Sequence, residues 1–278
     1  MVTRKLAVLG SPIEHSKSPA IHAAAYRVLG LDWDYSKFEV RKGGLSTFIA
    51  DLNQDWLGLS LTMPLKEEAA RFAATLDKAA EVTGAVNTLL RQGDVWAGFN
   101  TDVFGIVQAL YIAGVSDLDE VLIVGSGATA ISATAAIRQI SPQAQVKYFA
   151  RNPITRDSSI EFAKSLGLRA RAATNFVRAA NKADLVVSTL PAHGMDEVAL
   201  EASAARKFKP HGVLFDVAYQ PWPSQLASVW QTEQRPVISG LEMLLWQAVA
   251  QIRIFSCGDP SQQLPNEAAV VEAMRYAL

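Results

Sequence analysis

Four short polar segments interrupt the apolar N-terminal part of the chain, and their side chains have the chemistry of a reaction site. The segments are His15-Ser16-Lys17-Ser18-Pro19, Thr62-Met63-Pro64-Leu65-Lys66, Asn87-Thr88 and Asn100-Thr101-Asp102. Their hydroxyls, amides, lysine and aspartate suit a small polyhydroxylated or carboxylated ligand whose proton must be moved during a reaction. The sequence therefore predicts a polar site that binds such a ligand and exchanges a proton with it.

The chain around these segments alternates between patterns typical of strands and of helices. Short apolar runs bounded by turn residues predict strands, and apolar residues at helical spacing predict helices. The expected strands cover 5–9, 34–40, 56–61 and 86–90, and the expected helices begin at Pro19 and cover 66–76 and 79–83. Alternation of this kind indicates an α/β layer.

A second alternating run begins with an apolar strand over 120–124 and the Gly-rich turn Gly125-Ser126-Gly127-Ala128-Thr129-Ala130. Gly125 permits a tight turn, Gly127 lets the main chain approach a pyrophosphate, and Ala130 allows close packing of helix on sheet. Taken alone, such a loop can also be a structural turn, but its place between a strand and a helix favours a dinucleotide site, where helix N–H groups bind phosphate oxygens. Helices are also expected over 129–140 and from Leu241, and strands over 145–150, 184–188, 213–217 and 236–238.

The residues after the strand over 145–150 bear on the choice of cofactor. An NAD-selective protein usually places an acidic residue there for the ribose 2′-hydroxyl, whereas this chain has Ala150 followed by Arg151, with Arg156 nearby. A guanidinium can hold a 2′-phosphate bidentately and stack on adenine. The arginines therefore favour NADP, and the alternative is a solvated surface pair.

Composition excludes several classes of partner. The 278 residues are enough for two domains of ordinary size, and 26 Lys plus Arg against 27 Asp plus Glu leave no broad basic field for nucleic acid or an anionic membrane. No apolar run predicts a signal peptide or a membrane span. The single cysteine, Cys257, cannot form an internal disulfide, and the four histidines lack metal-ligand spacing. We expect a cytoplasmic protein that binds small molecules and no metal.

The ordered motifs together resemble the shikimate dehydrogenase family, which interconverts 3-dehydroshikimate and shikimate with a nicotinamide cofactor. The resemblance spans nearly the whole chain. Besides the segments above, it rests on the motifs over 10–19, 84–88, 98–102 with Gly105, 216–221, and 240–244 with Gln247.

The resemblance implies a role for each matching residue. Lys66 and Asp102 match the catalytic pair, and Ser16 and Ser18 match the serines that hold the substrate carboxylate. The other implied substrate contacts are Thr62, Asn87, Tyr219 and Gln247. The implied cofactor contacts are Gly125, Ser126, Gly127, Ala128, Thr129, Ala130, Arg151, Arg156 and Gly240. Ser18 before Pro19 is also an ordinary helix N-cap sequence, so a purely structural role stays open for it.

The resemblance also implies the architecture. We expect an N-terminal α/β substrate domain over 1–103, completed by helices over 241–278, and a doubly wound Rossmann-type NADP domain over 104–240. The reaction site would lie in the cleft between them, in a monomer or a homodimer.

Three alternatives stay open. A quinate/shikimate dehydrogenase or an aminoshikimate dehydrogenase would share nearly every motif, and a catalytically silent NADP-binding regulator could use the same fold.

Two segments depart from the family pattern. Ser60-Leu61-Thr62 stands where most relatives have Asn-Val-Thr, and residues 188–195 differ from the family's Asn-Ala-Thr form on the nicotinamide side.

Overall fold

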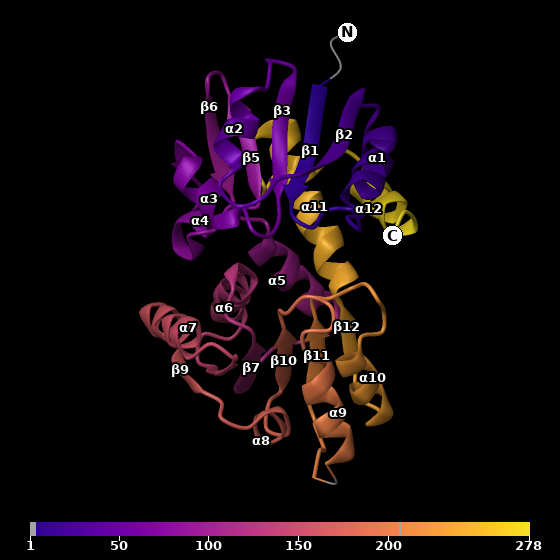
Figure 1. Cartoon of the computed structure of the whole chain (residues 1–278). Coiled ribbons are helices and arrows are strands. Elements are labelled where there is room, and N and C mark those ends of the chain that lie inside the picture. The colour runs from indigo at the N-terminus through magenta and orange to yellow at the C-terminus, as the bar shows by residue number, and fades with distance from the viewer. Residues whose placement is uncertain (1–3, 206) are drawn as a thin grey trace. The chain divides into compact units, whose positions relative to one another are not determined.

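The computed structural model describes residues 4–205 and 207–278. The chain divides into two compact units (Figure 1). The first unit comprises Met1–Gly105 and Leu244–Leu278, and the second comprises Ile106–Met243. The expected α/β fold class is confirmed. Among the described helices, none combines the length and the apolar character needed to cross a bilayer.

The first unit contains a six-stranded mixed sheet in the order β2-β1-β3-β5-β6-β4. Its first three strands are parallel, β5 runs antiparallel to both β3 and β6, and β4 is parallel to β6. The strands are β1 (Arg4–Gly10), β2 (Trp33–Glu39), β3 (Trp56–Leu61), β4 (Thr75–Leu76), β5 (Thr88–Gln92) and β6 (Val95–Phe99). The helices are α1 (Ser18–Leu29), α2 (Leu45–Ala50), α3 (Lys66–Phe72), α4 (Lys78–Thr83), α12 (Glu267–Tyr276), the start of α5 (Asp102–Ile112) and most of α11 (Gly240–Cys257).

Both faces of this sheet are covered, which explains the unbroken apolar run over 6–9 within β1. Leu6 and Val8 pack in the core cluster that includes α1, α11 and α12. Ala7 and Leu9, which point to the opposite face, pack with α2, α3 and α4. The C-terminal segment of the chain therefore completes the core of the N-terminal unit.

The second unit contains six parallel strands in the order β12-β11-β10-β7-β8-β9, which is the doubly wound order of a dinucleotide-binding domain. The strands are β7 (Glu120–Val124), β8 (Gln145–Phe149), β9 (Arg169–Ala172), β10 (Leu185–Ser188), β11 (Val213–Asp216) and β12 (Val237–Ser239). The helices between them are α6 (Ala128–Ile140), α7 (Pro153–Ser165), α8 (Phe176–Ala180), α9 (Asp196–Ala204) and α10 (Gln225–Thr232). Helices α8, α9 and α10 share one core cluster with β7, β10 and β11.

Two expected elements of the first unit are wrong in part. The helix expected over 66–76 ends at Phe72, because Ala73 is extended and the next N–H, that of Ala74, donates to Trp96 O, which leads the chain into β4. The strand expected over 86–90 begins only at Thr88. It continues through the tight turn Gly93-Asp94 into β6, a strand that the turn residues could have indicated.

Candidate functional site

Lys66 and Asp102 occupy equivalent places in the first unit, since each is the first residue of a helix that follows a strand of the sheet. Lys66 begins α3 after β3, and Asp102 begins α5 after β6. The Lys66 Nζ lies 2.5 Å from Asp102 Oδ2. The Lys66 side chain is 13% exposed and that of Asp102 is 5% exposed, so the pair is largely withdrawn from water. The structure thus brings the two residues expected to be catalytic into direct contact.

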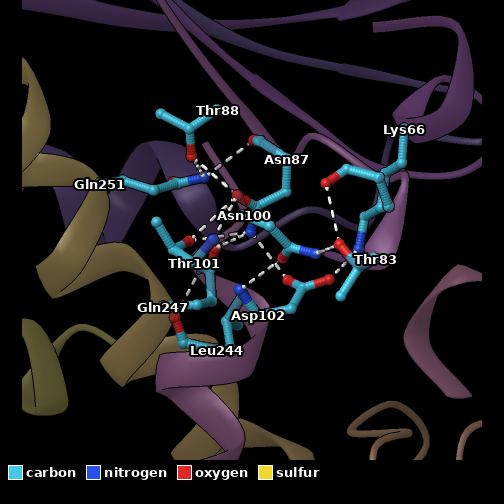
Figure 2. A network of polar contacts seen from close by, with 11 residues as sticks. Lys66, Thr83, Asn87, Thr88, Asn100, Thr101, Asp102, Leu244, Gln247 and Gln251 are labelled. Carbon is cyan, nitrogen blue, oxygen red and sulfur yellow. Dashed lines mark hydrogen bonds and ion pairs between the residues drawn. The ribbon is translucent and has the colours of Figure 1, made fainter. Parts of the chain in front are cut away.

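Asn87 holds the other side of the Asp102 carboxylate (Figure 2). Its Nδ2 donates to Asp102 Oδ1 at 2.8 Å and to Thr101 Oγ1 at 2.8 Å. The Asp102 main-chain N–H donates to Asn100 Oδ1 at 3.0 Å. Each carboxylate oxygen of Asp102 therefore has its own donor, and the side chain that partners Lys66 is held in one orientation.

Gln247 and Thr62 also belong to the first unit. Gln247, on α11, donates from Nε2 to Leu244 O at 2.8 Å, and its Oε1 lies 3.5 Å from Asn87 Nδ2. Thr62 lies in the short loop between β3 and α3, four residues before Lys66, where its carbonyl accepts from Leu65 N–H at 2.9 Å. Asn87, Gln247 and Asp102 therefore form one network, with Thr62 in the loop that leads to Lys66.

Ser16 and Ser18 lie in the loop after β1 and at the start of α1. The Ser16 Oγ accepts from the Ser18 main-chain N–H at 3.3 Å. The alternative in which Ser18 caps this helix is wrong, because Lys17 is the N-cap residue and Ser18 already has a place in the first turn. Ser18 is buried, and its side chain bonds to Tyr35, whose pKa is raised by burial and partly lowered by hydrogen bonds to Ser60 and Ser18.

The Gly-rich loop of the second unit lines a cavity of about 550 Å³. Gly125 has φ +111°, and a Cβ there would lie 2.4 Å from Thr189 Oγ1, so only glycine fits. A Cβ at Gly127 would meet no protein atom within 4 Å, so its main chain is open to a ligand. The cavity is lined by Val124, Gly125, Ser126, Gly127, Phe149, Ala150, Arg151, Asn152, Leu190, His193, Gly194, Met195, Asp196, Glu197 and Val198.

The other expected cofactor residues of this part of the second unit lie in the first turn of α6 or in the segment after β8. Ala128, Thr129 and Ala130 form the first turn of α6, where Ala130 is fully buried. Arg151 is exposed and lines the cavity. Arg156 is absent from that lining, and its Nη2 instead lies 2.8 Å from Asp157 Oδ1.

Gly240 and Tyr219 lie elsewhere in the second unit. A Cβ at Gly240 would lie 2.0 Å from Val217 O, so this glycine permits close packing of the start of α11. Tyr219 follows β11 and is half-buried, and burial raises the pKa of its hydroxyl. Neither residue lines the cavity of the Gly-rich loop. Within residues 4–205 and 207–278, no cluster of three His, Cys, Asp or Glu side chains could hold a metal ion.

Three further side chains, those of Gln251, Ser60 and Tyr35, adjoin this network and were not predicted from the sequence. Gln251 donates to Thr88 Oγ1 at 3.0 Å and accepts from Ser60 Oγ at 2.9 Å. Its position one helical turn after Gln247 was an available signal, because residues four apart lie on the same face of a helix.

Comparison with known proteins places relatives along the whole chain. A family model described as "Shikimate dehydrogenase substrate binding domain" matches residues 8–89, within the first unit. The "Shikimate dehydrogenase (NADP(+))" of Trichormus variabilis is 31% identical over 290 residues, which cover 99% of this chain and 96% of the relative. The protein of the same name from Thermus thermophilus is 30% identical over 274 residues, which cover 99% and 98% of the two chains.

Solved structures of shikimate dehydrogenases are also similar to this chain over nearly its whole length. The crystal structure of Mycobacterium tuberculosis shikimate dehydrogenase matches with a TM-score of 0.85 and 35% identity, covering 99% of this chain and 100% of that one. The Thermus thermophilus shikimate 5-dehydrogenase in complex with NADP(H) and shikimate matches with a TM-score of 0.81 and 29% identity, again covering 99% and 100%.

Proposed function

This chain belongs to the shikimate dehydrogenase family, and we propose that it interconverts 3-dehydroshikimate and shikimate as an NADP-dependent oxidoreductase. The observation that carries this proposal is the buried ion pair between Lys66 and Asp102, which Asn87 holds from the opposite side. The presence of Lys66 and Asp102 together, in contact at the matched catalytic positions, argues against a catalytically silent regulator.

The reduction of a ketone requires a hydride at carbon and a proton at oxygen. The Lys66 ammonium donates that proton and stabilises the negative charge that develops on the oxygen before the proton arrives. Asp102 keeps the ammonium in place through its contact with Nζ. In the oxidation of shikimate, the neutral Lys66 amine accepts the hydroxyl proton instead. Lys66 is therefore the general acid in one direction and the general base in the other.

The second unit fits NADP. The open main chain at Gly127 and the N-terminus of α6 suit a pyrophosphate, and Arg151 on the same cavity suits a 2′-phosphate. The bound nicotinamide supplies the hydride. Of the two arginines, we assign the 2′-phosphate chiefly to Arg151, since the guanidinium of Arg156 already forms an ion pair with Asp157.

The remaining site residues are assigned to substrate. Ser16 and Ser18 would bind the carboxylate, while Thr62, Asn87 and Gln247 would bind ring hydroxyls, all from the first unit. Tyr219, from the second unit, would contact the carboxylate or the nicotinamide side. We also propose a cytoplasmic monomer or homodimer, and the free, exposed Cys257 agrees with a compartment that keeps thiols reduced.

Replacing Arg151 with alanine is expected to weaken NADP binding by about 10- to 150-fold, because hydrogen bonds to a charged group contribute about 1.5 to 3 kcal/mol. NAD binding should change little, since NAD lacks the 2′-phosphate. Titrating both cofactors against the wild type, Arg151→Ala and Arg156→Ala measures this, and Arg156→Ala should show the smaller loss. Equal loss of NAD and NADP affinity in Arg151→Ala would contradict the assignment.

The proposed function is tested by initial rates of shikimate and of quinate oxidation with NADP and with NAD. We expect the highest kcat/KM for shikimate with NADP. A higher kcat/KM for quinate would favour a quinate/shikimate dehydrogenase, and no turnover of either substrate would favour a silent NADP-binding protein.

A further inference from the structure

A buried chain of polar side chains runs beneath the site and reaches Asp102 through Asn87. It begins at Tyr35 on β2, where the hydroxyl donates to Ser60 Oγ at 2.7 Å. Ser60, near the end of β3, donates in turn to Gln251 Oε1 at 2.9 Å. The first two bonds thus link two strands of the sheet to helix α11.

Gln251 connects this chain to the segment around Asn87 (Figure 2). Its Nε2 donates to Asn87 O at 3.1 Å and to Thr88 Oγ1 at 3.0 Å. Because the Thr88 hydroxyl accepts from Gln251, its single proton is free to donate to Asn87 Oδ1, which lies 2.8 Å away. The orientation of the Gln251 amide therefore sets the direction of the hydrogen bond from Thr88 to Asn87.

The chain determines which end of the Asn87 amide faces the carboxylate. Asn87 Oδ1 accepts from the Thr88 hydroxyl at 2.8 Å, from the Thr101 N–H at 2.9 Å and from the Thr101 hydroxyl at 3.1 Å. Nδ2 is consequently turned toward Asp102 Oδ1. The opposite orientation would place an amide oxygen against a carboxylate oxygen and would remove a donor from Asp102. The hydroxyl of Thr88 is thus one of three donors to Asn87 Oδ1, and it makes the shortest of the three hydrogen bonds.

The chain is shielded from water and carries no charge between Tyr35 and Asn87. Ser60, Thr88 and Gln251 are each at most 3% exposed. His22 stacks on Tyr35 with ring centroids 3.9 Å apart, and burial lowers the pKa of His22 to about 3, so the imidazole is neutral at physiological pH. In such an environment an unpaired polar group is costly, so each member holds its neighbour in place.

We propose that Gln251 and Thr88 are positioning residues for the reaction, acting through Asn87 on the carboxylate that holds Lys66. This inference rests on the proposed function, because it assigns the chain a role in the turnover that the Lys66–Asp102 pair performs. Neither residue needs to touch the substrate for this role.

The test is the matched pair Thr88→Val and Thr88→Ser. Valine keeps the shape of threonine and removes the hydroxyl, so kcat for shikimate should fall about 10-fold, the effect of one hydrogen bond of about 1.4 kcal/mol. Thr88→Ser retains the hydroxyl and should stay within about threefold of wild type, and KM for NADP should be unchanged in both. Thr134→Val removes a buried hydroxyl in the second unit and should leave kcat unchanged.

A merely structural role would lower the thermal midpoint of Thr88→Val but leave kcat per folded molecule at the wild-type value. Gln251→Leu provides a second variant in case valine at position 88 prevents folding, and it should also lower kcat. In an Asn87→Ala background, Thr88→Val should have no further effect on kcat, since the residue through which it acts is gone. Wild-type kcat in folded Thr88→Val and Gln251→Leu would overturn the proposal.

Failure of the proposed function would look different, because the wild type itself would not turn over shikimate. The positioning role is then decided by NMR of the Asn87 side-chain amide. Its two N–H resonances should shift or broaden in Thr88→Val but not in Thr88→Ser or Thr134→Val. Unchanged resonances in Thr88→Val would overturn the inference whatever the substrate.

Discussion

Replacing Lys66 with alanine is expected to lower kcat for shikimate oxidation by about 100- to 10,000-fold, the usual contribution of a general acid or base. In this direction the Lys66 amine accepts the hydroxyl proton of shikimate, and the structure places its Nζ against Asp102 in a largely buried pair. NADP affinity should stay nearly intact, because Lys66 belongs to the first unit and the cavity of the Gly-rich loop to the second. Steady-state rates and a cofactor titration measure both effects.

The second unit offers a matched control for the loss of a buried lysine. Lys147 Nζ lies 2.5 Å from Glu120 Oε2, and the Lys147 side chain is 9% exposed. Lys147→Ala removes a comparable ion pair without any assigned chemistry, so it should reduce stability but not kcat per folded molecule. Near-normal turnover in folded Lys66→Ala, or an equal loss of turnover in Lys147→Ala, would contradict the assignment of Lys66.

Replacing Asp102 with asparagine is expected to lower kcat by about 10- to 150-fold, since at least one charge-assisted hydrogen bond of about 1.5 to 3 kcal/mol is lost. The two carboxylate oxygens each accept from a donor, one from Lys66 and one from Asn87. Either orientation of an asparagine amide turns an NH₂ group toward one of those donors. The lysine would then be left without its counter-charge or the Asn87 amide without its acceptor.

The measurement is kcat together with the thermal midpoint of Asp102→Asn. Glu120→Gln makes the same carboxylate-to-amide change in the control pair and should leave kcat unchanged. If Asp102→Asn retained wild-type kcat while it unfolded at a lower temperature, the ion pair would be structural only.

The candidate site residues near the ends of strands and helices could be predicted from the sequence, for physical reasons. Apolar runs such as those in β1 and β7 predict buried strands, and short polar segments that interrupt an apolar part of the chain stand out as candidates for a site. Residue type and position therefore nominated the polar segments that contain Lys66, Asn87 and Asp102. The resemblance to the family supplied their chemical roles.

The buried chain beneath the site could not be predicted in the same way. Ser60 and Gln251 are 191 positions apart, and only the packing of α11 on the sheet brings them together. The capping role considered for Ser18 failed because the N-cap residue is set by backbone geometry, which places it at Lys17. The pairing of Arg156 with Asp157 depends on side-chain orientation at the start of α7, which residue type alone does not specify.

A crystal structure of the protein with shikimate and NADP⁺ tests the central assignment most directly, through the distance from Lys66 Nζ to the hydroxyl oxygen that is oxidised. We expect this distance to lie within hydrogen-bond range, about 2.6 to 3.2 Å, with Asp102 still bonded to Lys66 and Asn87. A complex in which that hydroxyl is bound by another acid or base, with Lys66 directed away from it, would contradict the assignment of Lys66 as the acid and base of the reaction.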